Sequence, residues 1–377
     1  MDINYLLFAA FLLIILQNIV VSYNSNRRVA IRLFANHYIN LKDCLSFALL
    51  LFLIIVAITD NDNPDYYNYQ VVYNTSTSTI LDTDIGYSFV MNCARKVGWS
   101  FETFHAVIYT FFYILLWISL VKLKLNKNIA IGLYALFPFA YDAIQIRFFC
   151  ATCIMLYSLS FLMDKKTGGI IKYLIGIIVA ATFHSLAIFY ILFLFVRIED
   201  SNKNRQTILR IAFAASCIAM MVSLFSDSFR NIFVYIFSLS TSSRKFNYYN
   251  QGVNWRNVFI LAVQELMFFY ASKINKDIAF SYDNQDKTRY REISTLLYGC
   301  NLAVCCTLPL LMVSQNFHRI YRNIYILNYG MFTLSADHNV RDQRNVFVIS
   351  LITLGFFSSL FWNYFQDGLD VLFVLFN

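Results

Sequence analysis

Apolar runs of about 20 residues recur along almost the whole chain and limit what it can fold into. Most of them are followed by a short polar segment in which Lys and Arg gather. Inside a bilayer no water satisfies the backbone N–H and C=O groups, so such runs form helices whose hydrogen bonds are internal. Of the 377 residues, 59% are hydrophobic and only 14% are charged, unlike a soluble domain. We therefore expect an all-α polytopic membrane protein.

The basic residues give the direction of each helix, because cytoplasmic loops carry an excess of Lys and Arg. Residues 1–377 then form a single membrane domain of about 12 transmembrane or half-membrane helices, within a range of 10 to 13. The first run lacks the features of a removable signal peptide and is expected to be a span. The expected spans cover 3–21, 41–58, 103–121, 129–141, 143–163, 170–196 (as two short helices), 207–226, 257–272, 293–313, 319–336 and 346–363.

Two expected turns follow from the charges and not from the hydropathy. The first lies near 138–142, because basic residues before 129 and after 163 both indicate the cytoplasmic side, so the chain must cross the membrane twice between them. The second falls at Phe183-His184-Ser185, because one span over 170–196 would place the next basic cluster outside. Arg147 and His184 then both lie near the outer surface.

The polar loops divide by charge into outer and inner ones. Residues 59–102 are rich in Asp and Tyr and form the first large extracytoplasmic loop, with amphipathic helices. The second of these helices starts at Asp84, ends near Gly98 and lines or covers an outer-face cavity. Residues 227–256 form a second extracytoplasmic loop, and residues 273–292 form a cytoplasmic one.

Three arginines are expected at the same outer level: Arg147, Arg319 and Arg322. Guanidinium groups bind phosphate oxygens in pairs and keep their charge, so this cluster suits a lipid-linked pyrophosphate. A cation inside an apolar run is also a functional-site hypothesis by default, which applies most directly to Arg147. The alternative is that these side chains reach out to lipid headgroups.

His184 lies at the expected helix break and has a pKa range that suits a general base or a hydrogen-bonding role near neutral pH. The alternative is a structural histidine. No histidine in the chain has the spacing of a known metal-binding motif.

The start of the first outer loop combines carboxylates with tyrosines. Asn63 and Pro64 predict a helix start, after which Asp65 lies in the first turn and Tyr66 and Tyr69 share one helix face. Aromatic faces beside carboxylates suit a sugar-binding groove, whereas the alternative is an interfacial amphipathic helix with an aromatic belt. The Asp-x-Asp spacing just before Asn63 also resembles a metal site, but a nucleotide-sugar site would be expected on the inner side.

Five short motifs, in order, resemble the EpsG family of exopolysaccharide polymerases, which is similar to the Wzy O-antigen polymerases. The resemblance spans roughly residues 45 to 335. Where family members often read IRQ, this chain reads Ile144-Gln145-Ile146-Arg147. The motifs are DYYNY, DIGY, IQIRFFCATCIMLYSLSFL, AATFHSLAIFY and FHRIYRN.

The resemblance implies a GT-C-like or Wzy-like helical bundle in the bacterial inner membrane, with its active site facing outside. It implies an enzyme that joins oligosaccharide repeat units carried on undecaprenyl pyrophosphate and releases the lipid pyrophosphate. Arg147, His184 and Asp65 are then the candidate catalytic residues. Gln145, Tyr66, Tyr69, Arg319 and Arg322 are the candidate substrate-binding residues. No metal or other cofactor is required, since arginine supplies the positive charge.

The expected partners are the lipid-linked oligosaccharide, membrane lipids, and a flippase and chain-length regulator of the same pathway. The net charge of +8 does not indicate nucleic acid, because the positive-inside rule accounts for it. Two other classes fit the same features. A GT-C glycosyltransferase with a lipid-phosphate donor would use the Asp-rich loop and a divalent cation. A polysaccharide flippase or other transporter would place its charges along a central path.

Overall fold

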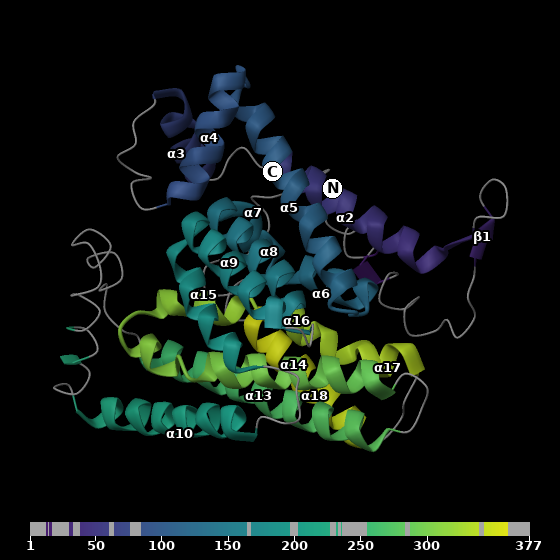
Figure 1. Ribbon diagram of the computed structural model, residues 1–377, viewed down its shortest axis with the longest axis vertical. Coiled ribbons are helices and arrows are strands. Elements are labelled where there is room, and N and C mark those ends of the chain that lie inside the picture. Colours follow the sequence, from purple (N-terminus) through teal and green to yellow (C-terminus); the bar gives the residue numbers. More distant parts are fainter. Residues whose placement is uncertain are drawn as a thin grey trace, which may run out of the picture. The chain divides into compact units, whose positions relative to one another are not determined.

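The computed structural model describes most of the chain as α-helix (Figure 1). The expected first span 3–21, the expected second outer loop 227–256 and the apolar stretch that follows Asp370 lie wholly or largely outside the described residues. The residues described are 13, 15–16, 30–32, 38–59, 64–75, 84–163, 167–196, 203–226, 231–232, 235, 255–282, 287–338 and 343–360.

The described residues form two compact units. Unit 1 draws on Met1–Ile191, Tyr329–Asp342 and Phe356–Asn377, and unit 2 on Leu192–Asn328 and Gln343–Gly355. Two units can belong to one membrane domain, so the single domain 1–377 stays a prediction.

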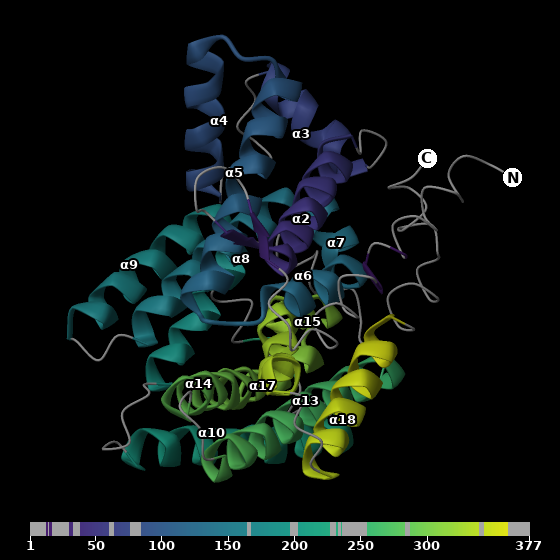
Figure 2. The ribbon, with the colours of Figure 1, turned by 90° about the vertical axis from the view of Figure 1, so that its right-hand side faces the viewer.

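Unit 1 contains the helices of the first half of the chain, with α8 packed against both α5 and α9 (Figure 1). Figure 2 shows α3 and α4 beside α5. Its elements are β1 (Ala30–Arg32), β2 (Tyr38–Asn40), α2 (Leu41–Thr59), α3 (Pro64–Thr75), α4 (Ile85–Val97), α5 (Phe101–Lys122), α6 (Lys127–Leu136), α7 (Phe139–Ile144), α8 (Ile146–Leu159), η2 (Ser160–Met163), α9 (Thr167–Phe183), most of η3 (Ser185–Phe195), η6 (Gly330–Phe332) and α17 (Thr333–His338).

Unit 2 is built on α13 and α14, which pack along each other, with α10 against α14. Its elements are α10 (Lys203–Phe225), α13 (Trp255–Ser281), α14 (Lys287–Cys305), η4 (Leu308–Met312), η5 (Gln315–Phe317), α15 (His318–Arg322), most of α16 (Tyr325–Tyr329) and most of α18 (Gln343–Leu360).

Four helical stretches in the described part are long and apolar enough to cross a membrane. They are Phe101–Lys122, Ile146–Met163, Trp255–Ser281 and Lys287–Met312, and shorter apolar helices also occur. The helical membrane class is thus supported, whereas the count of about 12 helices stays a prediction.

Local capping explains where α3, α4 and α5 begin or end. Helix α3 begins at Pro64 as predicted, because the ring of proline is compatible with the first helical position. Helix α4 ends at Gly98, whose φ of 82° is the left-handed conformation that glycine adopts without strain. Ser100 then starts α5 by accepting a hydrogen bond from the Thr103 N–H at 3.2 Å. These predictions are confirmed.

Both predicted breaks occur. Phe137 adopts an extended conformation before Pro138, which separates α6 from α7. A second interruption at Gln145 separates α7 from α8, so the expected single turn is in fact a short helix between two breaks. His184 separates α9 from η3, as the charge distribution predicted.

Three departures from the predictions are local. The expected span 319–336 is instead the series of short helices from α15 to α17, whose backbone is tolerated because it is buried in protein. Most of the expected loop 273–292 is helical, since α13 runs to Ser281 and α14 starts at Lys287. Residues 30–32 pair antiparallel with 38–40, a small exception to the all-α prediction that satisfies backbone groups outside any helix.

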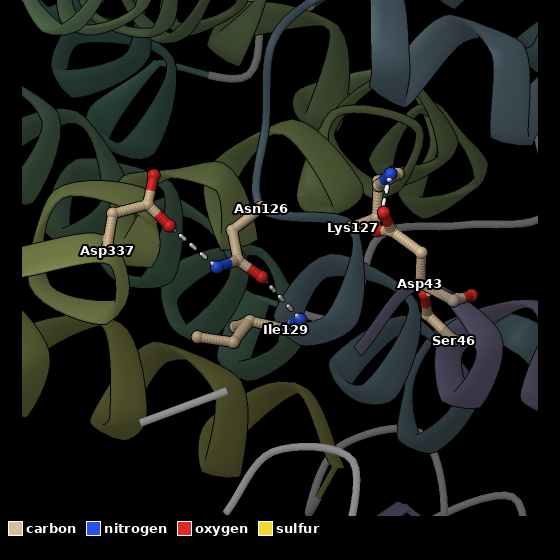
Figure 3. A network of polar contacts seen from close by, with 6 residues as sticks. All are labelled: Asp43, Ser46, Asn126, Lys127, Ile129 and Asp337. Carbon is tan, nitrogen blue, oxygen red and sulfur yellow. Dashed lines mark hydrogen bonds and ion pairs between the residues drawn. The ribbon is translucent and has the colours of Figure 1, made fainter. Parts of the chain in front are cut away.

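A polar network connects the start of α6 to two other elements of unit 1 (Figure 3). The Asn126 side chain accepts from the Ile129 N–H at 3.3 Å and donates to Asp337 at 3.0 Å. The next residue, Lys127, forms an ion pair with Asp43 of α2 at 2.8 Å. The capping residue of α6 therefore also holds α17.

Candidate functional site

Arg147 is the centre of the candidate site in unit 1. It lies in the first turn of α8, and its Nε donates a hydrogen bond to the Tyr69 hydroxyl at 2.8 Å. Its Nη1 forms an ion pair with Asp84 Oδ2. The Arg147 side chain is 23% exposed and that of Asp84 is 6% exposed, so the pair is largely removed from solvent. Helix α3, the residue that precedes α4, and α8 thus meet at one guanidinium group.

Asp84 immediately precedes α4, where aspartate usually caps a helix by accepting one of its first N–H groups. The Asp84 side chain makes no such capping bond. It is directed to Arg147, 63 residues along the chain. The residue therefore gives up its usual local role for a tertiary one, a conflict typical of functional sites.

The tyrosine face of α3 is buried, which corrects the prediction of an open sugar-binding groove. Tyr66 packs edge-on against Phe101 and His105. Tyr69 is also buried and packs against Tyr87 of α4. These rings attach α3 to its neighbouring helices. Because the Tyr66 ring is covered by residues of α5, it is not available to stack on a sugar ring of a substrate.

Tyr69 still contributes a polar group through its hydroxyl. Burial raises the pKa of Tyr69, although the positive charge of Arg147 opposes that rise. The hydroxyl thus keeps its proton near neutral pH while it accepts from Arg147. Asp65 lies one turn earlier in α3, half-buried, and its charge also raises the pKa of Tyr69. Asp60 and Asp62 lie outside the described residues.

His184 lies between α9 and η3, with its ring edge-to-face against Phe148 of α8 at 4.9 Å between centroids. Its Nδ1 accepts a hydrogen bond from the Leu186 N–H at 3.3 Å. In a neutral imidazole the other nitrogen, Nε2, then carries the hydrogen. This tautomer favours the hydrogen-bonding role predicted for His184 over that of a general base.

The first turn of α4 is held against the end of α9 through Gly86. A Cβ atom there would lie 2.9 Å from Thr182 Cβ and 3.1 Å from the Phe183 ring, so no side chain fits without displacement. Gly86 is two residues after Asp84, and Phe183 directly precedes His184. This contact therefore connects the segment of Asp84 to the segment of His184.

Arg319 and Arg322 lie on α15 in unit 2. Arg322 is only 1% exposed, so its guanidinium is enclosed by protein. This burial contradicts the alternative that Arg322 extends to lipid headgroups. The neighbouring Tyr321 hydroxyl accepts from Thr307 at 3.1 Å. The convergence of Arg147 with the two arginines of α15 stays a prediction.

A profile of the EpsG family matches residues 43–373 of the chain. The chain belongs to the EpsG family. That family is associated with polysaccharide polymerisation, a glycosyl transfer, in agreement with the resemblance read from the motifs. Comparison with curated proteins and comparison with solved structures each gave no match.

In this EpsG protein the structure adds two acidic residues that sequence reasoning missed. The sequence predicted Asp84 only as the start of a helix, and this local prediction did not indicate its contact with Arg147. Glu265 lies inside the apolar helix α13, is 1% exposed and accepts from the Tyr325 hydroxyl at 2.9 Å. Glu265 could have been identified from the sequence, because a carboxyl group inside an apolar span is itself a functional-site hypothesis.

Among the described residues of the EpsG protein, no group of three or more His, Cys, Asp or Glu could hold a metal ion. Since Asp60 and Asp62 are not described, the expectation that no cofactor is required stays a prediction. Gln145 lies between α7 and α8, half-buried, and its proposed contact with substrate also stays a prediction.

Proposed function

We propose that the protein polymerises oligosaccharide repeat units carried on undecaprenyl pyrophosphate, at the outer face of the bacterial inner membrane. The observation that carries the proposal is a largely buried arginine held by one carboxylate and one hydroxyl. Family membership supports the polymerase class. The lipid-linked unit is the partner in the reaction, and a flippase and a chain-length regulator act beside the enzyme.

In the proposed reaction, a hydroxyl oxygen of the incoming unit attacks the anomeric carbon of the growing chain. The bond between that carbon and the diphosphate oxygen breaks, and the lipid pyrophosphate leaves with the electron pair. Negative charge grows on the departing oxygen, so a positive group fixed nearby lowers the barrier. Arg147 supplies that charge in unit 1.

The diphosphate would replace Asp84 on Arg147, because carboxylate and phosphate oxygens accept from the same N–H groups. Tyr69 would keep the guanidinium oriented during the exchange through its bond to Nε. His184 would donate a hydrogen bond from Nε2 to the substrate. Arg319, Arg322, Asp65 and Gln145 remain proposed contacts to the two lipid-linked substrates.

The test is reconstitution of the chain in vesicles with a lipid-pyrophosphate-linked repeat unit, followed by separation of the glycans by size. Wild-type protein should give a ladder of repeat numbers. Arg147→Lys keeps the charge but loses the planar fork, so it should lose about 2 kcal/mol or more of transition-state binding, roughly 30-fold in rate. Arg95→Lys in α4 is the matched control, and it should leave the ladder unchanged.

Two results would contradict the proposal. Wild-type protein that leaves only single repeat units is not a polymerase of that substrate. A normal ladder from Arg147→Lys would show that the Arg147 guanidinium does not bind the diphosphate in the way proposed. Loss of activity on addition of EDTA would favour a glycosyltransferase that uses a lipid-phosphate donor and a divalent cation.

A further inference from the structure

Arg147 forms an ion pair with Asp84, and Lys127 forms one with Asp43. Asp43 is 46% exposed and its pair lies at the surface, where such contacts contribute little. Asp84 is enclosed, and its carboxylate directly contacts the proposed diphosphate-binding group. Burial of an ion pair costs desolvation free energy for both ions, so a buried pair is weak evidence for a stabilising role and suggests a functional one.

The reaction needs a general base that takes the proton of the attacking hydroxyl. The contacts of the acidic residues and of His184 in unit 1 reduce the number of candidates for this base. His184 accepts at Nδ1, so its Nε2 carries a hydrogen and donates. Asp142 is buried and accepts from the Tyr134 hydroxyl at 3.1 Å, within the packing of α6 and α7. Glu102 accepts from Gln70 at 3.1 Å. Asp65 lies half-buried in the first turn of α3, one turn before Tyr69, whereas Asp84 contacts Arg147 itself.

We infer that Asp84 is the catalytic base of the proposed transfer, an inference that rests on the proposed function. When the diphosphate takes the N–H groups of Arg147, the Asp84 carboxylate is released beside the reacting carbon. The hydroxyl oxygen of the acceptor forms the new bond to the anomeric carbon, and its proton moves to Asp84. The electron pair of the broken bond leaves with the diphosphate, so charge and atoms balance.

This exchange makes the base available only when the donor is bound. Before binding, the adjacent guanidinium stabilises the carboxylate as an anion and opposes proton uptake. After binding, the negative diphosphate lies between the arginine and the carboxylate and favours proton uptake. The missing capping bond at α4 leaves the Asp84 side chain committed to Arg147 and not to its own helix.

The experiment separates donor binding from turnover in detergent-solubilised full-length protein. Binding of a radiolabelled lipid-pyrophosphate-linked repeat unit gives the dissociation constant, and single-turnover extension gives the rate. In Asp84→Asn we expect the rate to fall about 100-fold or more, the usual contribution of a general base. The donor should bind equally well or more tightly, because no carboxylate competes for Arg147.

Asp84→Glu keeps the charge and moves the carboxylate by about one bond length, which should reduce the rate by about 10-fold with unchanged donor binding. Asp43→Asn removes the ion pair with Lys127 and should change neither quantity. Melting temperatures in the same detergent show whether each variant is folded.

Each outcome decides the inference. If Asp84→Asn turns over within threefold of wild type, or loses donor binding and rate in the same proportion, Asp84 is not the base. If Asp84→Asn is unfolded, Asp84→Ser takes its place, and a rate within threefold of wild type there overturns the inference. If wild-type protein itself extends no donor, the proposed function fails, which is a separate result.

Discussion

The hydroxyl group of Tyr325 donates a hydrogen bond to the Glu265 carboxyl group at 2.9 Å, inside unit 2. Both side chains are buried, and the Tyr325 ring also packs against Phe268 of α13. The bond connects α13 to α16, which follows the helix of Arg319 and Arg322. An acidic group at this depth is costly unless it is hydrogen-bonded, so the contact is expected to matter for stability.

Tyr325→Phe should destabilise the protein by about 1 to 3 kcal/mol, because it leaves a buried carboxyl group without this donor. Glu265→Gln should cost less, since its amide oxygen can still accept from Tyr325. Thermal unfolding in detergent measures both. Tyr270→Phe on the same helix is the control, because that side chain is 49% exposed. Equal stability of the Tyr325 and Tyr270 variants would exclude a stabilising role for the Glu265 contact.

Gly86→Ala should reduce both the stability and the activity of the protein. The added methyl group overlaps Thr182 and Phe183, so α4 must move away from the end of α9. Gly168→Ala is the control within α9, where no atom lies within 4 Å of a new Cβ, and it should be neutral or slightly stabilising. An unchanged melting temperature and extension rate in Gly86→Ala would show that this close contact is dispensable.

Tyr69→Phe should weaken donor binding while the protein stays folded. The change removes the acceptor for Arg147 Nε but keeps the ring that packs on Tyr87. Hydrogen bonds to charged groups contribute about 1.5 to 3 kcal/mol, which corresponds to roughly 10- to 150-fold in the dissociation constant. Tyr67→Phe is the matched control, because Tyr67 lies on the same helix and is 65% exposed. Identical donor affinity in the two variants would argue against orientation of Arg147 by Tyr69.

Two substitutions separate the roles of the His184 nitrogens. His184→Gln places an amide near Nε2 and can donate to substrate, whereas His184→Asn places an oxygen near Nδ1 and can accept from Leu186. If Nε2 donates in the reaction, the Gln variant should keep more of the extension rate than the Asn variant, with similar donor binding in both. The reverse order would assign His184 to the helix break alone.

Cysteine labelling in a background without native cysteines tests the orientation. Cysteines at the exposed positions Ser185 and Asn74 should react with an impermeant reagent from outside the cell, and one at Gly168 should not. Reaction of the Ser185 position only after the membrane is opened would place His184 on the cytoplasmic side. The outer-face location of the proposed reaction would then be wrong.

Local physical chemistry made much of the fold predictable from the sequence. The helical class follows from apolar runs, because every backbone group must be satisfied within its own segment. The breaks at Pro138 and Gly98 follow from the conformational limits of single residues, and the break at His184 followed from the sign of neighbouring charges. Arg147 was identified from the sequence because a cation in an apolar run is energetically costly and therefore indicates a functional site.

Only the tertiary structure decided which groups meet. Asp84 and Arg147 are 63 residues apart, and Glu265 and Tyr325 are 60 apart, so no local pattern could pair them. Periodicity correctly placed Tyr66 and Tyr69 on one face of α3, yet that face packs on a neighbouring helix. A sequence pattern states which side chains share a face, whereas burial of that face depends on the partner that packing brings to it.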